Sequence, residues 1–374
     1  LNKASADFDW SEISPTIFGA LFESTLNGQT RRAGGMHYTS IENIHKVIDP
    51  LFLSDLENNL SEICEISVSR TKIKRLKEFQ TRLASLVFLD PACGSGNFLT
   101  ETYLSLRRLE NIVISELSNG QMYFGTPDGK IGPIKVSIGQ FYGIEINDFA
   151  VTVAKTALWI AESQMMKATE DIVHMSLDFL PRKSYAHIVE GNALKMDWEA
   201  VVPKCKLNFI MGNPPFVGQA MRTKEQANDM QVVFRSGSGG KLDYAAGWFK
   251  KAADFMCATV VETAFVTSNS LCQGESVNLL WNNLRQDDMK INFAHTTFKW
   301  TNEAKGQAAV MCVIVGFSQI NHKIKKLFTG GAVKHVDSIN GYLNAAPDVF
   351  IRNRKKTINR ELAKAFQGSP PADD

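Results

Sequence analysis

The chain has 374 residues, of which 44% are hydrophobic and 21% charged, a balance that allows a sizeable core and is ordinary for a soluble globular protein. Its 41 basic and 39 acidic residues give a formal net charge of +2, which excludes few classes of ligand. The longest apolar run, near residue 313, is too short to span a bilayer, so we expect a cytoplasmic protein with no membrane contact.

The first 85 residues are predicted to form a helical segment. Ser14 and Pro15 make a favourable N-cap and first-turn pair, and residues 61–85 have the pattern of a basic amphipathic helix. Between the predicted helices lies AGGMHYTS, residues 33–40, whose glycines predict a loop.

Basic residues are concentrated in two segments, 70–82 and 323–360. They lie either on solvated helix faces or on a surface that meets phosphates. The six cysteines are far apart and form no C-x-x-C pair, so we expect neither a zinc site nor a disulfide framework. Such cysteine usage is typical of a reducing cytosol.

From residue 86 onward, short apolar runs alternate with helical patterns. The predicted strands are LVFLD (86–90), FYGIEI (141–146), the start of AHIVEGNAL (186–194), LNFIMG (207–212) and ETAFVTS (262–268), followed by a hairpin of 291–298 and 308–317. This order predicts an α/β fold with a mostly parallel sheet, covered on both faces, and an antiparallel hairpin at its edge. Residues 115–140, rich in glycine and turn pairs, predict an inserted hairpin.

In such a sheet, ligands bind beyond the carboxyl ends of the strands. The first strand is followed by DPACGSGNF, residues 90–98, in which Gly94 and Gly96 permit close approach of a ligand to the backbone. The loop has neither the G-K-[ST] of a phosphate-binding loop nor a full G-x-G-x-x-G. ATP and NAD are therefore poor candidates for its ligand.

Two further polar residues follow strands. Glu145 ends the second strand, where a carboxylate accepts from both hydroxyls of a ribose, and the alternative is a surface glutamate. Asn192 follows the third strand, where its side-chain oxygen would accept from an adenine amine, although asparagine is also common in ordinary turns. Together with the glycine loop, they indicate a nucleoside pocket.

The fourth strand ends in an unusual corner, FIMGNPPF, residues 209–216. Two prolines cannot continue a central strand, because proline has no N–H for the ladder. The corner presents an amide at Asn213, a rigid backbone and an aromatic at Phe216, beside the predicted nucleoside pocket.

This layout resembles the class I S-adenosylmethionine-dependent methyltransferases, which have a Rossmann-like sheet. DPACGSGNF and NPPF together resemble the N6-adenine DNA methyltransferases. In detail the chain is similar to the MmeI-like family of combined restriction–modification enzymes, in which GALFESTLN, GMHYTS, GNAL-x-x-DW and FKWTNEAKGQAAV occur in this order. The resemblance covers most of the chain.

The resemblance implies a set of site residues. For S-adenosylmethionine they are Tyr38, Thr39, Ser40, Asp90, Ala92, Gly94, Gly96, Phe98, Glu145, Ile146 and Asn192. For catalysis they are Asn213, Pro214, Pro215 and Phe216, with Phe298 or Trp300 as the aromatic that supports a flipped base. Many relatives have Asp at the position of Asn192, but an amide oxygen can still accept from an amine.

The implied activity is transfer of a methyl group to the N6 amine of an adenine flipped out of double-stranded DNA. The side-chain oxygen of Asn213 and the carbonyl of Pro214 would hold the two amine hydrogens, and Phe216 would stack on the base. The methyl group is carried on a reactive sulfonium, so positioning matters more than acid–base chemistry and no metal is expected.

Two other classes of protein stay open. RNA and protein-glutamine methyltransferases also use corners of the NPPY type, usually without DPACGSG in the first loop. A non-catalytic DNA-binding module with a methyltransferase fold is the second alternative, and the intact NPPF argues against it.

The predicted domains are a helical segment at 1–85 with the cofactor loop 33–40, a catalytic domain at 86–330, and a linker at 331–374. The chain begins at Leu1 rather than Met, so we expect it to be part of a longer protein. The family resemblance implies fusion to a target-recognition domain, which would read the DNA sequence, and possible fusion to a nuclease domain.

Overall fold

The computed structural model describes residue 15 and residues 39–118, 133–174, 186–235, 237–300 and 310–350. Several predictions fall outside these residues: the helix that follows Ser14, Tyr38 with most of its loop, and most of the predicted inserted hairpin. The segments 301–309 and 351–374, and the side chain of Trp300, also lie outside them.

Within the described ranges, nine strands form one sheet in the order β3-β2-β1-β4-β5-β7-β6-β8-β9. They are β1 (Phe88–Asp90), β2 (Phe141–Glu145), β3 (His187–Glu190), β4 (Phe209–Gly212), β5 (Glu262–Ser268), β6 (Lys290–Trp300), β7 (Val310–Ser318), β8 (Lys325–Thr329) and β9 (Ala332–Val336). The first five strands in the sheet order are parallel, and β7 is antiparallel to both of its neighbours. The predicted α/β fold with a mostly parallel sheet is confirmed, and its strand order reverses between β1 and β4, where ligands of such sheets bind.

The edge of the sheet differs from the prediction. The hairpin of β6 and β7 lies inside the sheet, because β8 pairs with β6 and β9 pairs with β8. The Gly330–Gly331 turn was not predicted, although its two glycines have the positive φ angles of a tight hairpin, +56° and +86°. Since β9 is mostly exposed and has little apolar alternation, its residues were predicted to belong to a linker.

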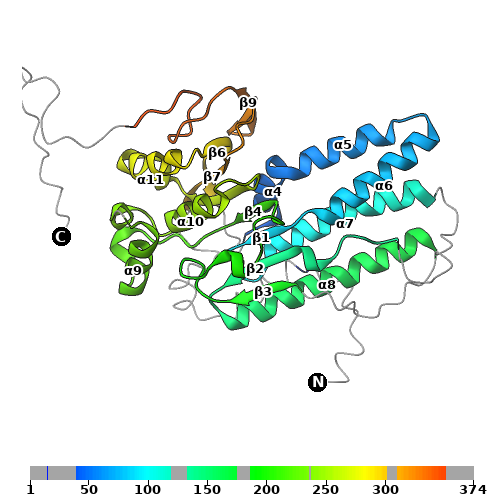
Figure 1. Ribbon diagram of the computed structural model, residues 1–374, viewed down its shortest axis with the longest axis horizontal. Coiled ribbons are helices and arrows are strands. Elements are labelled where there is room, and N and C mark those ends of the chain that lie inside the picture. Colours follow the sequence, from blue (N-terminus) through cyan, green and yellow to red (C-terminus); the bar gives the residue numbers. More distant parts are fainter. Residues whose placement is uncertain are drawn as a thin grey trace, which may run out of the picture.

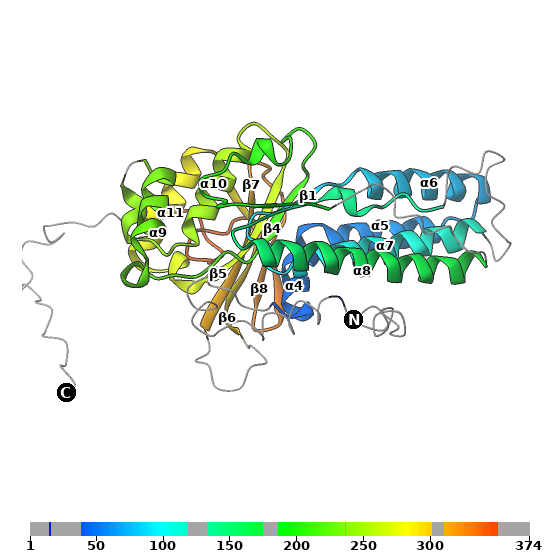
Figure 2. The ribbon, with the colours of Figure 1, turned by 90° about the horizontal axis from the view of Figure 1, so that it is seen from below.

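Helices cover both faces of the sheet (Figures 1 and 2). They are α4 (Ile41–Ile48), α5 (Ser54–Cys64), α6 (Ser69–Ser85), α7 (Asn97–Ser118), α8 (Asp148–Val173), α9 (Lys224–Val233), α10 (Ala246–Met256) and α11 (Gly274–Gln286), with a π-helical turn at Asp49–Leu53. In Figure 2, α5 to α8 extend from the sheet as a long arm, and α9 to α11 lie at the opposite end of the molecule.

Two apolar cores lie on the two faces of the sheet, and adjacent strand residues alternate between them. Phe88 belongs to the core with α4 to α8, and Leu89 to the core with α10 and α11. In the first core the ring of Phe52 lies 5.1 Å from that of Phe88 and 4.9 Å from that of Phe209. The described part of the predicted N-terminal helical segment, residues 39–85, therefore packs directly on the sheet.

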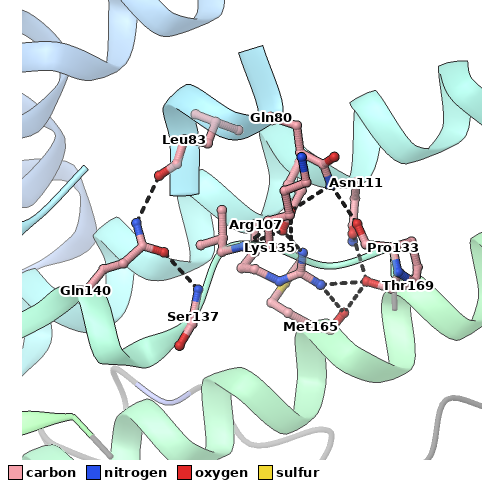
Figure 3. A network of polar contacts seen from close by, with 12 residues as sticks. Gln80, Leu83, Arg107, Asn111, Pro133, Lys135, Ser137, Gln140, Met165 and Thr169 are labelled. Carbon is pink, nitrogen blue, oxygen red and sulfur yellow. Dashed lines mark hydrogen bonds and ion pairs between the residues drawn. The ribbon is translucent and has the colours of Figure 1, made fainter. Parts of the chain in front are cut away.

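A buried polar network fixes the backbone that leads into β2 (Figure 3). The guanidinium of Arg107 pairs with Glu110 and donates to Thr169 Oγ1 at 2.6 Å. Glu110 also accepts from Gln80 and from the backbone N–H of Lys135. Because the four side chains that bond within this network are buried, it holds α6, α7, α8 and the segment 133–137 in one arrangement.

The predicted inserted hairpin takes a different form where it is described. Residues 115–118 continue α7, and Ile138–Gln140 forms a short 3-10 helix before β2. No strand occurs among the described residues of 115–140. No helix in the described ranges is both long enough and apolar enough to cross a membrane.

Candidate functional site

A cavity of about 300 Å³ lies at the carboxyl ends of the parallel strands, where the strand order reverses. Ten residues that the sequence predicted for the site line it: Thr39, Asp90, Ala92, Gly94, Phe98, Glu145, Ile146, Asn192, Asn213 and Pro215. They come from segments far apart in the sequence, which the sheet topology brings together.

Other predicted residues lie near the cavity without lining it. Ser40 is the N-cap residue of α4, and Pro214 is buried beside the cavity. Gly96 packs against α8, since a Cβ there would come within 2.8 Å of Ala154 Cβ. Phe216 is half-buried and packs against both apolar cores.

The glycine loop is held by hydrogen bonds to buried carboxylates. Asp90 Oδ1 accepts from the Ala92 N–H at 3.0 Å, and Glu145 Oε2 accepts from the Gly94 N–H at 2.9 Å. Glu145 Oε1 also accepts from the Asn147 N–H at 3.0 Å. Glu145 therefore joins the ends of β1 and β2 on the cavity wall.

Burial dominates the electrostatics of this wall. The pKa of Asp90 is raised to about 8, chiefly by burial and to a smaller extent by the nearby charge of Glu145, while the Ala92 N–H opposes the rise. Burial also raises the pKa of Glu145 above its usual range, although the N–H groups of Asn147 and Gly94 oppose the rise. A cation bound between them would favour the charged form of both carboxylates.

The end of β4 approaches β1 very closely. Gly212 has φ +156°, and a Cβ on it would lie 2.4 Å from Asp90 Oδ1. Only glycine permits this approach without movement of the carboxylate. Gly212 therefore also fixes the distance between the loop that follows β1 and the loop that follows β4.

Asn213 lines the cavity, and only one end of its side-chain amide has a hydrogen-bond partner among the described residues. Its Nδ2 donates to Thr39 Oγ1 at 3.2 Å. Its Oδ1 is buried and accepts no hydrogen bond from any residue in the described part of the chain. A buried acceptor left in this state is costly in the absence of a ligand that donates to it.

Asn192 makes contacts that the sequence did not indicate. Its Oδ1 accepts from the Leu194 N–H at 2.9 Å, and its Nδ2 donates to Asp229 Oδ2 at 2.9 Å. The amide therefore makes one hydrogen bond within its own turn and one to a carboxylate from another segment. One lone pair on Oδ1 can still accept a hydrogen bond.

Phe298 and Trp300, the two candidates for supporting a flipped base, both belong to β6. Phe298 lies on β6 outside the cavity lining, and Lys46 Nζ lies 5.2 Å from the centre of its ring. Trp300 ends the same strand, and its side chain lies outside the described residues.

One wall of the cavity was not predicted from the sequence. It comes from the segment between β4 and β5 and consists of Thr223, Glu225, Gln226, Asp229, Tyr244 and Trp248. Thr223 and Gln226 form a capping box, a pattern that would have predicted the start of α9. Nothing in the pattern indicated that α9 faces the cavity.

The basic cluster on α6 is partly neutralised by neighbouring acids. Lys72 pairs with Glu116 at 2.7 Å, and Lys74 and Arg75 both lie 3.8 Å from the carboxylate of Glu78.

In the ranges that the structure covers, no group of three or more His, Cys, Asp or Glu residues could hold a metal ion.

Comparison with known proteins identifies the relatives of this chain. A family profile described as "MmeI, DNA-methyltransferase domain" matches residues 66–329. DNA methyltransferase A of Bacillus subtilis (strain 168) is 40% identical over 372 residues, which cover 98% of this chain and 41% of the relative. The chain therefore spans less than half the length of that protein.

Solved structures agree with this comparison. The type IIL restriction–modification enzyme MmeI in complex with DNA superimposes with a TM-score of 0.87 at 40% identity, covering 94% of this chain and 47% of that chain. The DrdV–DNA complex gives a TM-score of 0.50 at 14% identity. The match covers 89% of this chain and 33% of that chain, and it indicates a shared fold.

Proposed function

The chain belongs to the MmeI DNA-methyltransferase domain family, and on that premise we propose that it transfers a methyl group from S-adenosylmethionine to the N6 amine of adenine. The proposed substrate is an adenine flipped out of double-stranded DNA, and the proposed setting is a restriction–modification system. The observation that carries the proposal is Asn213 Oδ1, a buried acceptor on the cavity wall with no described partner.

The chemistry of the amine explains the need for such an acceptor. The lone pair of the exocyclic nitrogen is delocalised into the adenine ring, which makes it a poor nucleophile. Asn213 Oδ1 accepting one amine hydrogen and the Pro214 carbonyl accepting the other would draw the nitrogen toward a tetrahedral geometry. The proline pair fixes the backbone of that carbonyl before the base arrives, so little reorganisation is needed in the transition state.

The cavity has groups suited to each part of S-adenosylmethionine, which supplies a methyl group on a sulfonium when bound. Asp90 and Thr39 lie at the end next to Asn213 and are proposed to meet the methionine part. Glu145 is proposed to accept from the ribose hydroxyls, and Ile146 and Asn192 to contact the adenine. The buried acidic groups suit a ligand that carries positive charge.

Base support is proposed to come from Phe216 and from one aromatic of β6. Phe216 follows the proline pair, so its ring can reach the base that the amide and carbonyl hold. Phe298 has Lys46 over its ring, which favours Trp300 for the second role. Flipping the base costs a few kcal/mol, which contacts of this kind offset.

The chain is proposed to consist of three parts, with further domains fused to it. We propose a helical segment at 1–85, a catalytic domain at 86–330 and a joining segment at 331–374, although the sheet itself continues through β9. DNA-sequence recognition, and any cleavage, would then depend on further domains fused to this one.

The test is transfer of tritium from S-[methyl-³H]adenosylmethionine to plasmid DNA, followed by digestion to nucleosides. With the longest reading frame that contains this chain as the enzyme, we expect the label in N6-methyladenine. We expect Asn213→Ala in that protein to remove most of it while S-adenosylhomocysteine binding persists. RNA and a glutamine-bearing protein serve as competing substrates. Label in cytosine, RNA or protein would contradict adenine in DNA as the substrate.

The assay compares this chain with the longest reading frame that contains it, on a DNA library of mixed sequence. Because base-edge contacts in a groove carry sequence discrimination, we expect site-specific methylation from the longer protein and little or none from the chain alone. Site-specific methylation by residues 1–374 alone would contradict the domain proposal.

A further inference from the structure

The cavity contains a buried carboxylate to which the proposed mechanism gives no role. Asp229 belongs to α9, has only 2% of its surface exposed and lines the cavity. Its Oδ2 accepts from Asn192 Nδ2 at 2.9 Å and from the Tyr244 hydroxyl at 2.8 Å. Two donors from separate segments therefore hold the carboxylate in one orientation.

The other oxygen of Asp229 has a different environment. Oδ1 is buried and receives no hydrogen bond within the described ranges. Lys195 Nζ lies 3.0 Å away as an ion pair, and the side chain of Lys195 is half exposed. Since a carboxylate oxygen accepts more than one hydrogen bond, Oδ1 can accept from a neutral N–H of a ligand as well.

The position of Asp229 in the cavity follows from its partner Asn192. Asn192 follows β3, at one end of the strand order β3-β2-β1-β4, and Asn213 follows β4 at the other. Glu145 ends β2, between them. A nucleoside with its ribose at Glu145 and its amino-acid part near Asn213 would therefore have its base beside Asn192 and Asp229.

This juxtaposition changes the role expected for Asn192. The side-chain nitrogen of Asn192 donates a hydrogen to Asp229, and its side-chain oxygen already accepts from the Leu194 N–H. Asn192 thus acts as a positioning residue, and the carboxylate it positions is the stronger acceptor, because charged acceptors form shorter and stronger hydrogen bonds.

Resting on the proposed function, we propose that Asp229 determines the purine specificity of the cofactor site by accepting a hydrogen from the exocyclic amine of adenine. A 6-keto purine presents an oxygen at the same position, and two acceptors would then face each other. The site would reject such a purine because the buried carboxylate is left without its donor.

The experiment compares the binding of S-adenosylhomocysteine and S-inosylhomocysteine by calorimetry. The two ligands differ at the purine 6-position, where a keto group replaces the amine, and at N1, which carries a hydrogen only in the inosyl compound. The Asp229 variant isolates the contribution of the 6-position. We expect the unchanged protein to prefer the adenosyl compound by about 100-fold or more, since sites built for an N–H donor discriminate strongly.

The informative variant is Asp229→Asn, which keeps the shape of the side chain and removes its charge. An amide can rotate to donate its N–H to a keto oxygen, so we expect the preference to narrow to about tenfold or less. Asp254→Asn on the surface of α10 is the matched control, because it makes the same chemical change outside the cavity lining. The control should keep the full preference.

Tyr244→Phe provides a second test that leaves the carboxylate in place. It removes one of the donors to Oδ2, and the preference for the adenosyl compound should fall several-fold. If thermal unfolding shows that Asp229→Asn does not fold, Tyr244→Phe alone tests the role of Asp229.

The outcomes separate the two proposals. If S-adenosylhomocysteine binds and the folded variants keep the full preference, the role of Asp229 is refuted and the cofactor site stands. If neither compound binds the unchanged protein, the proposed cofactor site and the role of Asp229 both fall.

Discussion

Asn213 donates from Nδ2 to the hydroxyl of Thr39 at 3.2 Å, across 174 positions of the sequence. This bond fixes the orientation of the amide, because the end that donates to Thr39 cannot also face the cavity. In the proposed mechanism, the buried Oδ1 at the other end of this amide is the acceptor for the substrate amine. We therefore propose that Thr39 acts on catalysis through Asn213, in addition to the cofactor contact implied by the family resemblance.

Replacing Thr39 by valine separates these two roles. Thr39→Val keeps the shape of the side chain but removes the acceptor for Asn213 Nδ2, so the amide loses its fixed orientation. We expect methyl transfer to slow by roughly fivefold, which corresponds to a hydrogen bond of about 1 kcal/mol. The affinity for S-adenosylhomocysteine, measured by calorimetry, should fall by a smaller factor than the rate of methyl transfer.

Thr39→Ser retains the hydroxyl and is the control for this change. Its rate should stay near that of the unchanged protein. If Thr39→Val instead weakens S-adenosylhomocysteine binding as much as it slows transfer, Thr39 acts as a ligand of the cofactor and not through Asn213.

Glu145 is expected to support both the cavity wall and the cofactor. In Glu145→Gln one side-chain oxygen becomes an amide nitrogen, which would face the N–H of either Gly94 or Asn147, two donors in contact. We expect the affinity for S-adenosylhomocysteine to fall by roughly 1–3 kcal/mol, the range for hydrogen bonds to charged groups. The melting temperature of the unliganded protein should fall as well.

Glu190→Gln is a matched control, because Glu190 pairs in register with Glu145 on β3 but is exposed. It should change neither the affinity nor the melting temperature. Calorimetry that finds the same affinity in Glu145→Gln as in the unchanged protein would remove Glu145 from the ribose site.

Gly212 is predicted to tolerate no side chain. In Gly212→Ala the new Cβ would lie 2.4 Å from Asp90 Oδ1, on a backbone with φ +156°, so the carboxylate and the end of β4 must move apart. We expect a loss of about 1–3 kcal/mol in the free energy of unfolding, as for overpacked core positions. Urea denaturation of the unliganded protein measures it.

Gly218→Ala is the control for that change. It lies six positions further along, its φ is −60°, and a Cβ there would meet no atom within 4 Å. Its stability should equal or slightly exceed that of the unchanged protein. Equal stability of the two alanine variants would show that β1 and β4 adjust to a side chain at Gly212.

The parallel half of the sheet was predictable because its strands are apolar runs followed by polar loops with distinctive residues. The strand that ends in Glu145 is an example, since burial on both faces leaves few polar residues in it. The hairpin at Gly330 was overlooked because an exposed edge strand has no such run. The wall formed by α9 was also not predictable, because the bond between Asn192 and Asp229 joins residues 37 positions apart and depends on how the chain packs.

The raised pKa of Asp90 predicts a specific dependence of stability on pH. In the unfolded chain this carboxyl has its usual pKa near 3.8, and in the folded protein burial raises it to about 8. Between these two values the folded protein holds a proton that the unfolded chain has released, so the free energy of unfolding falls as pH rises. The slope for one full proton is about 1.4 kcal/mol per pH unit, and the effect is complete above pH 8.

Glu145 and His45 change stability in the same direction, since both pKa values are raised in the folded protein. The contribution of Asp90 must therefore be isolated by Asp90→Asn, which cannot ionise. Urea denaturation at pH 5.5 and at pH 8 should show a smaller loss of stability in this variant than in the unchanged protein. If both proteins lose the same amount, Asp90 is already ionised in the folded state at pH 5.5, and its burial does not hold a proton there.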